Sequence, residues 1–173
     1  MTIKVTKRDN IQEPLDLEKM HKVVFFACED IAGVSASEVE IKSQISFYDG
    51  IRSEEIQETL IKAAADLISE ETPNYQWVAG NLINYHLRKM VYDDFTPWSL
   101  KKIVKHNVDA GFYDPALLRD YSTEEWDELD KTIKHDRDFE ISYVGMEQFR
   151  GKYLVQNRST GKIYETPQIA YML

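Results

Sequence analysis

Cysteine is almost absent from this chain of 173 residues, and its scarcity excludes several kinds of site. The single thiol, Cys28, leaves no disulfide within the chain, no Cys-x-x-Cys redox pair and no zinc site built on paired cysteines. It falls in an apolar helical run, so we interpret it as a small buried hydrophobic residue. This usage fits a reducing compartment.

Positive charge is also in short supply. The chain has 21 lysines and arginines against 30 aspartates and glutamates, which gives a formal net charge of -9. Binding to a nucleic-acid backbone needs a basic surface that releases counterions, so nucleic acid is excluded as the main partner. A nucleotide needs only a local basic cluster and remains compatible with this charge.

Long apolar runs are missing as well. No segment approaches the roughly 20 apolar residues that cross a bilayer, and the beginning Met1-Thr2-Ile3-Lys4-Val5 lacks the apolar stretch of a signal peptide. The hydrophobic content of 43% is ordinary for a globular protein and is enough for one good core or two small ones. We therefore expect a cytoplasmic protein with no membrane partner.

The first half of the sequence predicts a β-hairpin followed by four helices. The turn at Asp9 and Asn10 joins the two strands, since both residue types tolerate the positive φ of a short hairpin loop. Asp16 is expected to cap the first helix and Ser53 the third, while Gly33 and Pro73 mark helix ends. The expected strands are 3–8 and 11–15, and the expected helices are 16–33, 37–46, 53–72 and 74–91, with Val39, Ile41 and Ile45 facing inward on the second.

The second half predicts shorter elements after a boundary at residues 93–97. Ser122 and Glu125 form a capping-box signature, and Ser159-Thr160-Gly161 is typical of a turn. The expected helices are 98–110, 115–119, 122–134 and 142–150, followed by a hairpin of strands 153–156 and 162–165.

Cations occur at two places that are far apart in the sequence. Lys7 and Arg8 lie in the first strand and Lys19 in the first helix, whereas His86 and Lys89 share one face of the fourth helix with Tyr85. A triphosphate needs several charge-assisted donors from different elements, because no single side chain neutralises it. These residues are therefore candidates for phosphate binding.

Other residues suit the remaining parts of a nucleotide. The Ser53 hydroxyl lies at the start of the third helix, where the helix dipole favours anions. Glu13 and Asp16 offer acceptors beside the apolar Val5 and Ile56, which is a reasonable lining for a base and a ribose.

Each of these residues also has a more ordinary interpretation. Lys7 and Arg8 on an edge strand are usually solvated charges that prevent edge pairing. Lys89 is typical of a surface lysine with a buried stem, and His86 of a structural histidine. Only the constellation favours a site. The run His135-Asp136-Arg137-Asp138 offers an imidazole and two carboxylates, but we interpret it as a salt-linked helix end rather than a metal or acid–base centre.

Two sets of strings resemble a known family. Val5-Thr6-Lys7-Arg8-Asp9 and Ile61-Lys62-Ala63-Ala64-Ala65 resemble the ATP-cone, a regulatory nucleotide-binding module. The later strings, 152–158 and 161–168, resemble the segment that leads into the catalytic barrel of the class I ribonucleotide reductase large subunit. The resemblance implies a mainly α (α+β) fold, in which residues 3–93 form a four-helix bundle capped by a β-hairpin. Residues 94–173 would be a helical, incomplete part of the catalytic domain that ends in a β-hairpin.

The resemblance also implies a site for ATP or dATP as an allosteric effector, with Mg²⁺ accompanying the phosphates. It nominates Lys7, the segment 13–19, Ser53, Gln57 and Lys89. Together with the residues argued above, the expected binding set is Val5, Lys7, Arg8, Glu13, Pro14, Leu15, Asp16, Leu17, Glu18, Lys19, Ser53, Ile56, Gln57, His86 and Lys89. No catalytic or metal-ligating residue is expected.

Three positions, two of them in this binding set, depart from the family pattern. Asn10 stands where glycine is common and accepts the same turn geometry. Asp16 occupies a position that is asparagine in some relatives, and Gln57 one that can be histidine or aspartate. An added carboxylate repels phosphate and glutamine supplies no cation, so ATP binding is expected while inhibition by dATP is left open.

The resemblance implies a component of ribonucleoside-diphosphate reductase, the oxidoreductase that makes deoxyribonucleotides for DNA synthesis. The radical-bearing cysteine and the redox cysteine pair of that family are absent, so we expect no activity and no redox cofactor in this chain alone. The expected partners are the remainder of the large subunit, joined or as a separate polypeptide, and the radical-generating small subunit. The alternative is a degenerate cone that only completes a split reductase. A cone-bearing repressor would need zinc-ribbon cysteines and a basic DNA-binding face.

Overall fold

The computed structural model describes residues 3–7 and 10–173, and these divide into two compact units. The first unit is Met1–Ile83 with Ile141–Met146, and the second is Asn84–Glu140 with Glu147–Leu173. The mainly α fold with one small sheet that the sequence predicts is confirmed. Among the described residues, no helix is long and apolar enough to cross a membrane. The predicted domains, 3–93 and 94–173, stay a prediction.

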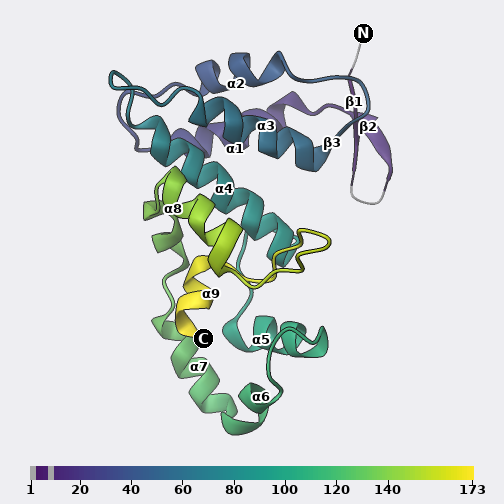
Figure 1. Cartoon of the computed structure of the whole chain (residues 1–173), viewed down its shortest axis with the longest axis vertical. Helices are drawn as coiled ribbons and strands as arrows, with labels where there is room; N and C mark the ends of the chain where they lie inside the picture. The colour runs from purple at the N-terminus through teal and green to yellow at the C-terminus, as the bar shows by residue number, and fades with distance from the viewer. Residues whose placement is uncertain (1–2, 8–9) are drawn as a thin grey trace. The chain divides into compact units, whose positions relative to one another are not determined.

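The first unit is built on a three-stranded sheet and a group of helices. The strands β1 (Lys4–Thr6), β2 (Gln12–Pro14) and β3 (Ile51–Arg52) lie in the order β2-β1-β3. β1 pairs with β2 in antiparallel register, with Val5 opposite Glu13, and with β3 in parallel register, with Val5 opposite Ile51. The sequence predicts the hairpin and misses β3, which has only two residues. Figure 1 shows the sheet at one end of the helices.

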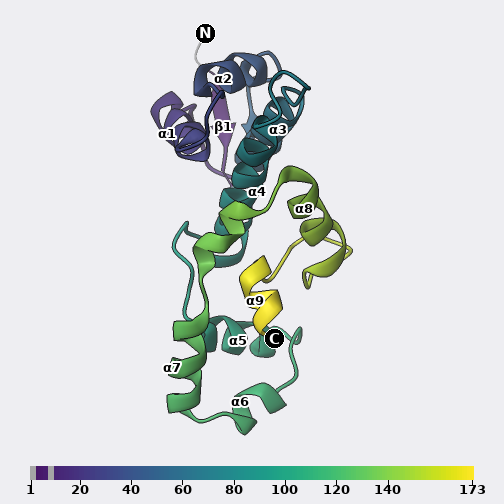
Figure 2. The ribbon, with the colours of Figure 1, turned by 90° about the vertical axis from the view of Figure 1, so that its left-hand side faces the viewer.

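Four helices follow in the order that the sequence predicts. They are α1 (Leu17–Cys28), α2 (Ala36–Gln44), α3 (Ser53–Ala65) and α4 (Tyr75–Tyr92), of which the last runs from the first unit into the second. α1, α2 and α3 lie side by side around β1 (Figure 2). The inward faces of the four helices form a core, and its fully buried members are Val24, Ala27, Val39, Leu60, Ala64, Val78, Ala79, Leu82 and Ile83.

Several boundaries differ from the prediction. α1 ends at Cys28 rather than near Gly33, because Asp30 already adopts a positive φ of 60°. α3 ends at Ala65 rather than near Pro73, since its last turn tightens and the Thr72 hydroxyl donates to the Leu67 carbonyl at 2.7 Å. Ser53 is the first residue of α3, whereas the N-cap is Arg52, so that prediction was wrong by one position.

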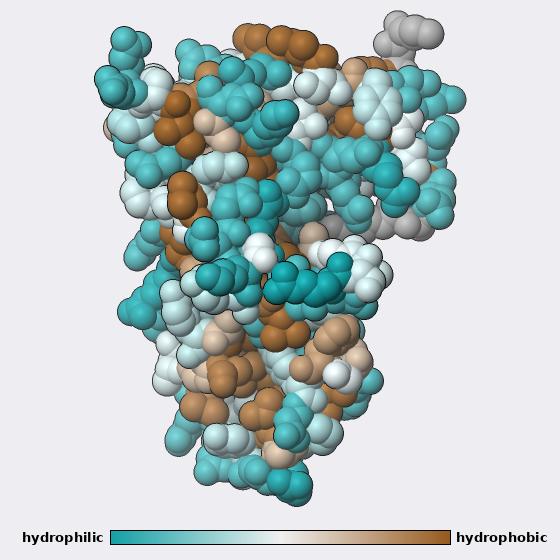
Figure 3. All heavy atoms as spheres, viewed as in Figure 1, coloured by the Kyte–Doolittle hydropathy of each residue, from teal (hydrophilic) through white to brown (hydrophobic). Residues whose placement is uncertain are grey.

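The prediction that Ile41 and Ile45 face inward was wrong. They are 65% and 84% exposed, while Val39 and Ser43, four residues apart, form the buried face of α2. A helix of nine residues buries one narrow stripe, and these two isoleucines fall outside it. Figure 3 shows apolar side chains at the surface over α2.

Gly80 fixes the position of the segment Ile141–Met146 in the first unit. A Cβ atom on Gly80 would lie 2.4 Å from the carbonyl oxygen of Ile141 and 3.2 Å from the backbone nitrogen of Tyr143. Real Cβ atoms do not approach backbone this closely, so only glycine allows the contact. The backbone of residues 141–143 therefore packs directly on α4.

The second unit contains short helices. They are α5 (Leu100–Asp109), α6 (Ala116–Asp120), α7 (Thr123–Thr132), the 3₁₀ helix η1 (His135–Glu140), α8 (Tyr143–Gln148, shared with the first unit), the π-helix η2 (Phe149–Tyr153) and α9 (Pro167–Met172). The capping box of Ser122 and Glu125 at α7 is confirmed. α5 packs against α6 and α7, as Figures 1 and 2 both show.

The predicted C-terminal hairpin is wrong in extent. A single antiparallel bridge joins Gln156 and Ile163, and no strand forms there among the described residues. The π-helix occupies the beginning of the expected first strand, and the N–H of Val155 donates to a Glu165 carboxylate oxygen at 2.8 Å instead of to a strand partner. The predicted turn is present, with Gly161 at a φ of 71°.

Candidate functional site

The β-hairpin places Lys7 next to Glu13. The Lys7 Nζ lies 2.7 Å from the Glu13 Oε1, and the two side chains are 32% and 47% exposed. The loop is closed by hydrogen bonds from Lys7 N to Ile11 O at 2.8 Å and from Asn10 N to Lys7 O at 2.9 Å. Asn10 has a φ of 64°, which agrees with the predicted turn geometry. Arg8 and Asp9 lie outside the described residues.

The strand β3 brings the beginning of α3 to the same edge of the sheet. Thr6 pairs with Arg52 in parallel register, and the next residues along the two strands are Lys7 and Ser53, the latter being the first residue of α3. The hydroxyl of Thr6 donates to Gly50 O at 2.9 Å, and Gly50 N donates to Lys4 O at 2.8 Å, which fixes this register. This short strand pairs residues that are 46 positions apart in the sequence, such as Thr6 and Arg52.

The first turn of α3 carries negative charge of its own. The Glu55 carboxylate accepts hydrogen bonds from Arg52 N and from the Tyr48 hydroxyl, each at 2.9 Å, and these bonds hold the pKa of Glu55 below its usual value. Ile56 is buried at 6% exposure beneath this turn, whereas Ser53 and Gln57 are half-buried. Ser53 and Gln57 are four residues apart and therefore share one face of α3.

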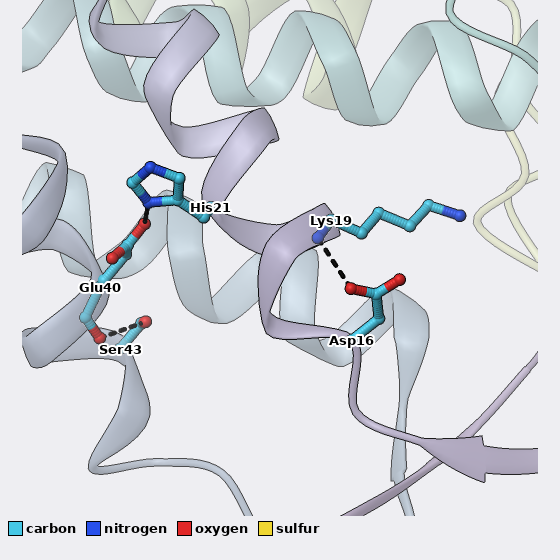
Figure 4. Close-up of polar contacts among 5 residues, drawn as sticks. All are labelled: Asp16, Lys19, His21, Glu40 and Ser43. Carbon is cyan, nitrogen blue, oxygen red and sulfur yellow. Dashed lines mark hydrogen bonds and ion pairs between the residues drawn. The ribbon is translucent and has the colours of Figure 1, made fainter.

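Asp16 begins α1 as predicted. Its Oδ1 accepts a hydrogen bond from Lys19 N at 2.9 Å, which satisfies one of the unpaired N–H groups of the first turn. Figure 4 shows this cap and the Lys19 side chain extending away from His21. One carboxylate oxygen of Asp16 is therefore already used as a hydrogen-bond acceptor by the first turn of α1.

A hollow of about 500 Å³ lies between α1 and α2, beside this cap. Its lining includes Leu17 and Glu18, two of the predicted binding residues, together with Met20 and Gln44. The His21 Nδ1 lies 2.7 Å from the Glu40 Oε1 across the two helices. The sequence prediction did not include His21 or Glu40, because nothing in the spacing of the two helices indicates that they meet.

Two predicted residues, His86 and Lys89, lie on the second half of α4 and so in the second unit. His86 is buried at 5% exposure. The Lys89 Nζ donates to Asp93 O at 2.8 Å and lies 5.5 Å from the centre of the Phe95 ring. That these two residues join the residues of the first unit around one ligand stays a prediction.

The first unit thus carries Lys7 and Glu13 on its hairpin and Asp16 and Ser53 at two helix beginnings, and Val5 and Ile56 are buried at 4% and 6% exposure. That these residues surround one ligand stays a prediction. Comparison with known sequences supplies the family. The model of the ATP cone domain matches residues 3–90. The chain belongs to the ATP-cone family.

Similarity to individual proteins extends beyond the ATP cone to nearly the whole chain. The chain is 51% identical to the ribonucleoside-diphosphate reductase subunit alpha of Haemophilus influenzae over 99% of this chain and 23% of that protein. It is 50% identical to ribonucleoside-diphosphate reductase 1 subunit alpha of Escherichia coli over 98% of this chain and 22% of the relative. For the subunit alpha of Enterobacteria phage T4 the identity is 43%, with the same coverage. The chain spans less than a quarter of the length of these curated relatives.

Proposed function

We propose that this chain is the effector-binding N-terminal part of a ribonucleoside-diphosphate reductase large subunit. ATP or dATP binds the cone and shifts how the large subunit associates with itself or with its small subunit. This is a coupling of binding free energies between separate sites, so a ligand acts only through its different affinities for the two assembled states. The chain has no catalytic role by itself.

One observation carries the proposal. The parallel pairing of β1 with β3 joins Thr6 to Arg52, and Lys7 and Ser53 are the residues that follow these two in the sequence. A lysine ammonium and a hydroxyl at a helix N-terminus are complementary to phosphate. The nearby hairpin and α1 cap add Glu13 and Asp16, whose oxygens accept from the amino and hydroxyl groups of a nucleoside.

Lys7 exchanges partners when the effector binds. In this structure its ammonium pairs with the Glu13 carboxylate at 2.7 Å. A triphosphate offers this ammonium more negative charge than one carboxylate does, so Lys7 turns to the phosphates. Glu13 is then free to accept a hydrogen bond from the nucleoside. Because both side chains are partly exposed to solvent, the ion pair is weak, and breaking it costs little free energy.

The finer assignments belong to the same proposal. Arg8, His86 and Lys89 complete the charge around the phosphates, and Mg²⁺ accompanies them. Pro14, Leu15 and Leu17 shape the wall beside the nucleoside, while Glu18, Lys19 and Gln57 set its polar contacts. The partners are the radical-generating small subunit and the rest of the large subunit, which is either continuous with this chain or a separate polypeptide. The protein acts in the cytoplasm.

Calorimetric titration of the chain with ATP and dATP tests the proposal. We expect saturable binding of ATP, and Lys7→Ala should weaken it by about tenfold to a hundredfold, the value of a hydrogen bond to a charged group. Lys131→Ala is the matched control, because it removes the same charge from the exposed surface of α7. Absence of binding of either nucleotide at millimolar concentration would refute the assignment.

A thermal shift separates this proposal from a degenerate cone. A ligand that binds only the folded chain raises its stability by about 2.7 kcal/mol at a hundredfold excess over Kd. A cone that only completes another polypeptide shows no shift with ATP. In that case the Lys7→Ala and Lys131→Ala variants would also show the same melting temperature with and without ATP.

A further inference from the structure

The turn between α2 and β3 contains Asp49-Gly50, the only place in the sequence where an aspartate or asparagine is followed by glycine. A hydrogen bond from Ile51 N to Tyr48 O at 3.2 Å closes this turn. Gly50 has a φ of 87°, a conformation that glycine adopts without the strain that a side chain would cause. The turn therefore favours glycine at this position, and aspartate is a common neighbour in such turns.

An aspartate that precedes glycine can react with its own backbone. The backbone nitrogen of the second residue attacks the side-chain carboxyl carbon of the first, and the approach is least hindered when the second residue has no side chain. Asp49 is exposed, and a Cβ atom on Gly50 would meet no heavy atom within 4 Å. The turn therefore has room for a ring to close and is open to the water that completes such a reaction.

The backbone of Lys4, in β1, holds both reacting groups of this pair. Lys4 N donates to the Asp49 Oδ1 at 2.8 Å, and Gly50 N donates to Lys4 O at 2.8 Å. The Thr6 hydroxyl, further along β1, donates to Gly50 O at 2.9 Å. While β1 lies in the sheet, the nitrogen and the carboxylate are thus fixed by hydrogen bonds, and neither is free to turn toward the other.

We propose that Asp49 is a site of spontaneous isomerisation to isoaspartate, and that the pairing of β1 with this turn controls the rate. The reaction occurs when β1 opens locally and releases both groups from Lys4. Short strands at the edge of a fold open far more often than the whole chain unfolds. The reaction requires no nucleotide, so it is independent of effector binding.

The chemistry balances without an oxidant, a metal or an enzyme. In the first step the Gly50 nitrogen bonds to the Asp49 side-chain carbon, and the amide proton and the carboxyl hydroxyl leave together as water. In the second step one water opens the resulting succinimide ring. If the bond between the nitrogen and the main-chain carbonyl carbon of Asp49 breaks, the product is isoaspartate, whereas breakage of the other bond restores aspartate. The mass of the chain is unchanged.

The product cannot keep the contacts of this turn. In isoaspartate the main chain passes through the side-chain carbons, so it is one atom longer, and the α-carbon carries a free carboxylate. Gly50 can then no longer pair with Lys4 while Ile51 stays opposite Val5. Because β3 has only two residues, we expect its pairing with β1 to be lost once isoaspartate forms.

Incubation of the whole chain at neutral pH and physiological temperature tests the proposal. A methyltransferase specific for isoaspartyl groups counts the product, and a protease that cleaves before aspartate but not before isoaspartate locates it. We expect isoaspartate at residue 49, formed more slowly by about tenfold or more in the native chain than in guanidinium chloride, because β1 must open first. Asp49→Glu keeps the carboxylate but requires a larger ring that closes slowly, so it should remove the signal.

A matched pair of substitutions at Thr6 tests the control by β1. Thr6→Val deletes the hydrogen bond to Gly50 O and preserves the shape of the side chain, so the native variant should isomerise about threefold to tenfold faster, the effect of one hydrogen bond. Thr6→Ser retains the donor and should isomerise at nearly the parent rate. In guanidinium chloride the parent and both variants should react at one rate, because the strand is absent there.

Three results would overturn the proposal. Absence of isoaspartate at residue 49 in the denatured parent chain would show that the pair is unreactive. Equal rates in the native and denatured parent chains would show that the fold does not control the reaction. Equal native rates for Thr6→Val and Thr6→Ser would remove β1 from that control. Should Thr6→Val fail to fold, the comparison of native with denatured parent chain still decides.

Discussion

The two units of this chain treat polar side chains in opposite ways. The first unit keeps its candidate site at the surface, where Lys7 and Glu13 are 32% and 47% exposed and Asp16 caps a helix in contact with solvent. The second unit buries much of its polar chemistry, including Asn84, Asn107, Asp138, Glu165 and Thr166. Exposed pairs exchange partners easily, whereas buried groups are costly to rearrange. The exposed arrangement of the first unit suits reversible binding of a ligand, whereas the buried polar groups of the second unit help to fix one packing arrangement.

The largest expected effect tests whether the first unit depends on its apolar core rather than on its surface pairs. Leu60 of α3 is fully buried at 0% exposure, so Leu60→Ala should lower the free energy of unfolding by about 3 kcal/mol through lost contacts and a cavity. Ile45→Ala, at a position 84% exposed, should change it by less than about 0.5 kcal/mol. Urea denaturation measures both. Equal losses would mean that exposed residues stabilise this unit as much as its core does.

A second prediction concerns Cys28, which is half-buried rather than fully buried as the sequence predicts. Burial, with a smaller contribution from the charge of Glu40, raises the pKa of its thiol to about 11 from 9.0. Near pH 8 this lowers the thiolate fraction by about a hundredfold, so alkylation by iodoacetamide should be slower by that factor in the folded chain than in denaturant. Mass spectrometry follows the reaction. Similar rates in the two states would show that the thiol is freely reactive.

The smallest expected effect concerns the N-cap of α7 in the second unit, where Ser122 is replaced either by alanine or by another capping residue. The Ser122 hydroxyl accepts from Glu125 N at 3.2 Å, and the Glu125 carboxylate accepts from Ser122 N at 2.7 Å. Ser122→Ala should lower the free energy of unfolding by about 1 kcal/mol, while Ser122→Asp, which retains an acceptor, should preserve most of it. Thermal denaturation of the two variants decides. A loss shared by both would point to packing of the serine rather than to capping.

Local signals in the sequence predict much of this structure. Asp16 at the beginning of α1 and Ser122 with Glu125 at α7 follow from capping chemistry, which acts within one turn. The inward faces of α1 and α3 follow from helical periodicity. The ion pair of Lys7 with Glu13 was not predicted, since Glu13 lies opposite Val5 in the register.

The features that sequence reasoning missed depend on contacts between distant residues. The strand β3 is two residues long, too short for any alternating pattern to appear, yet it pairs Thr6 with Arg52, directly before α3. The shortened C-terminal hairpin follows from the Glu165 carboxylate taking the N–H of Val155. Asp138 was interpreted as part of a salt-linked helix end, and nothing in its neighbours predicts complete burial.

The close approach at Gly80 has a practical consequence for anyone who wishes to prepare the cone by itself. A gene fragment truncated after residue 93 would encode all four helices of the bundle but would delete residues 141–146, whose backbone rests on this glycine. The exposed strip of α4 would then invite aggregation during expression. A fusion that retains the returning segment through a short linker is the sounder design.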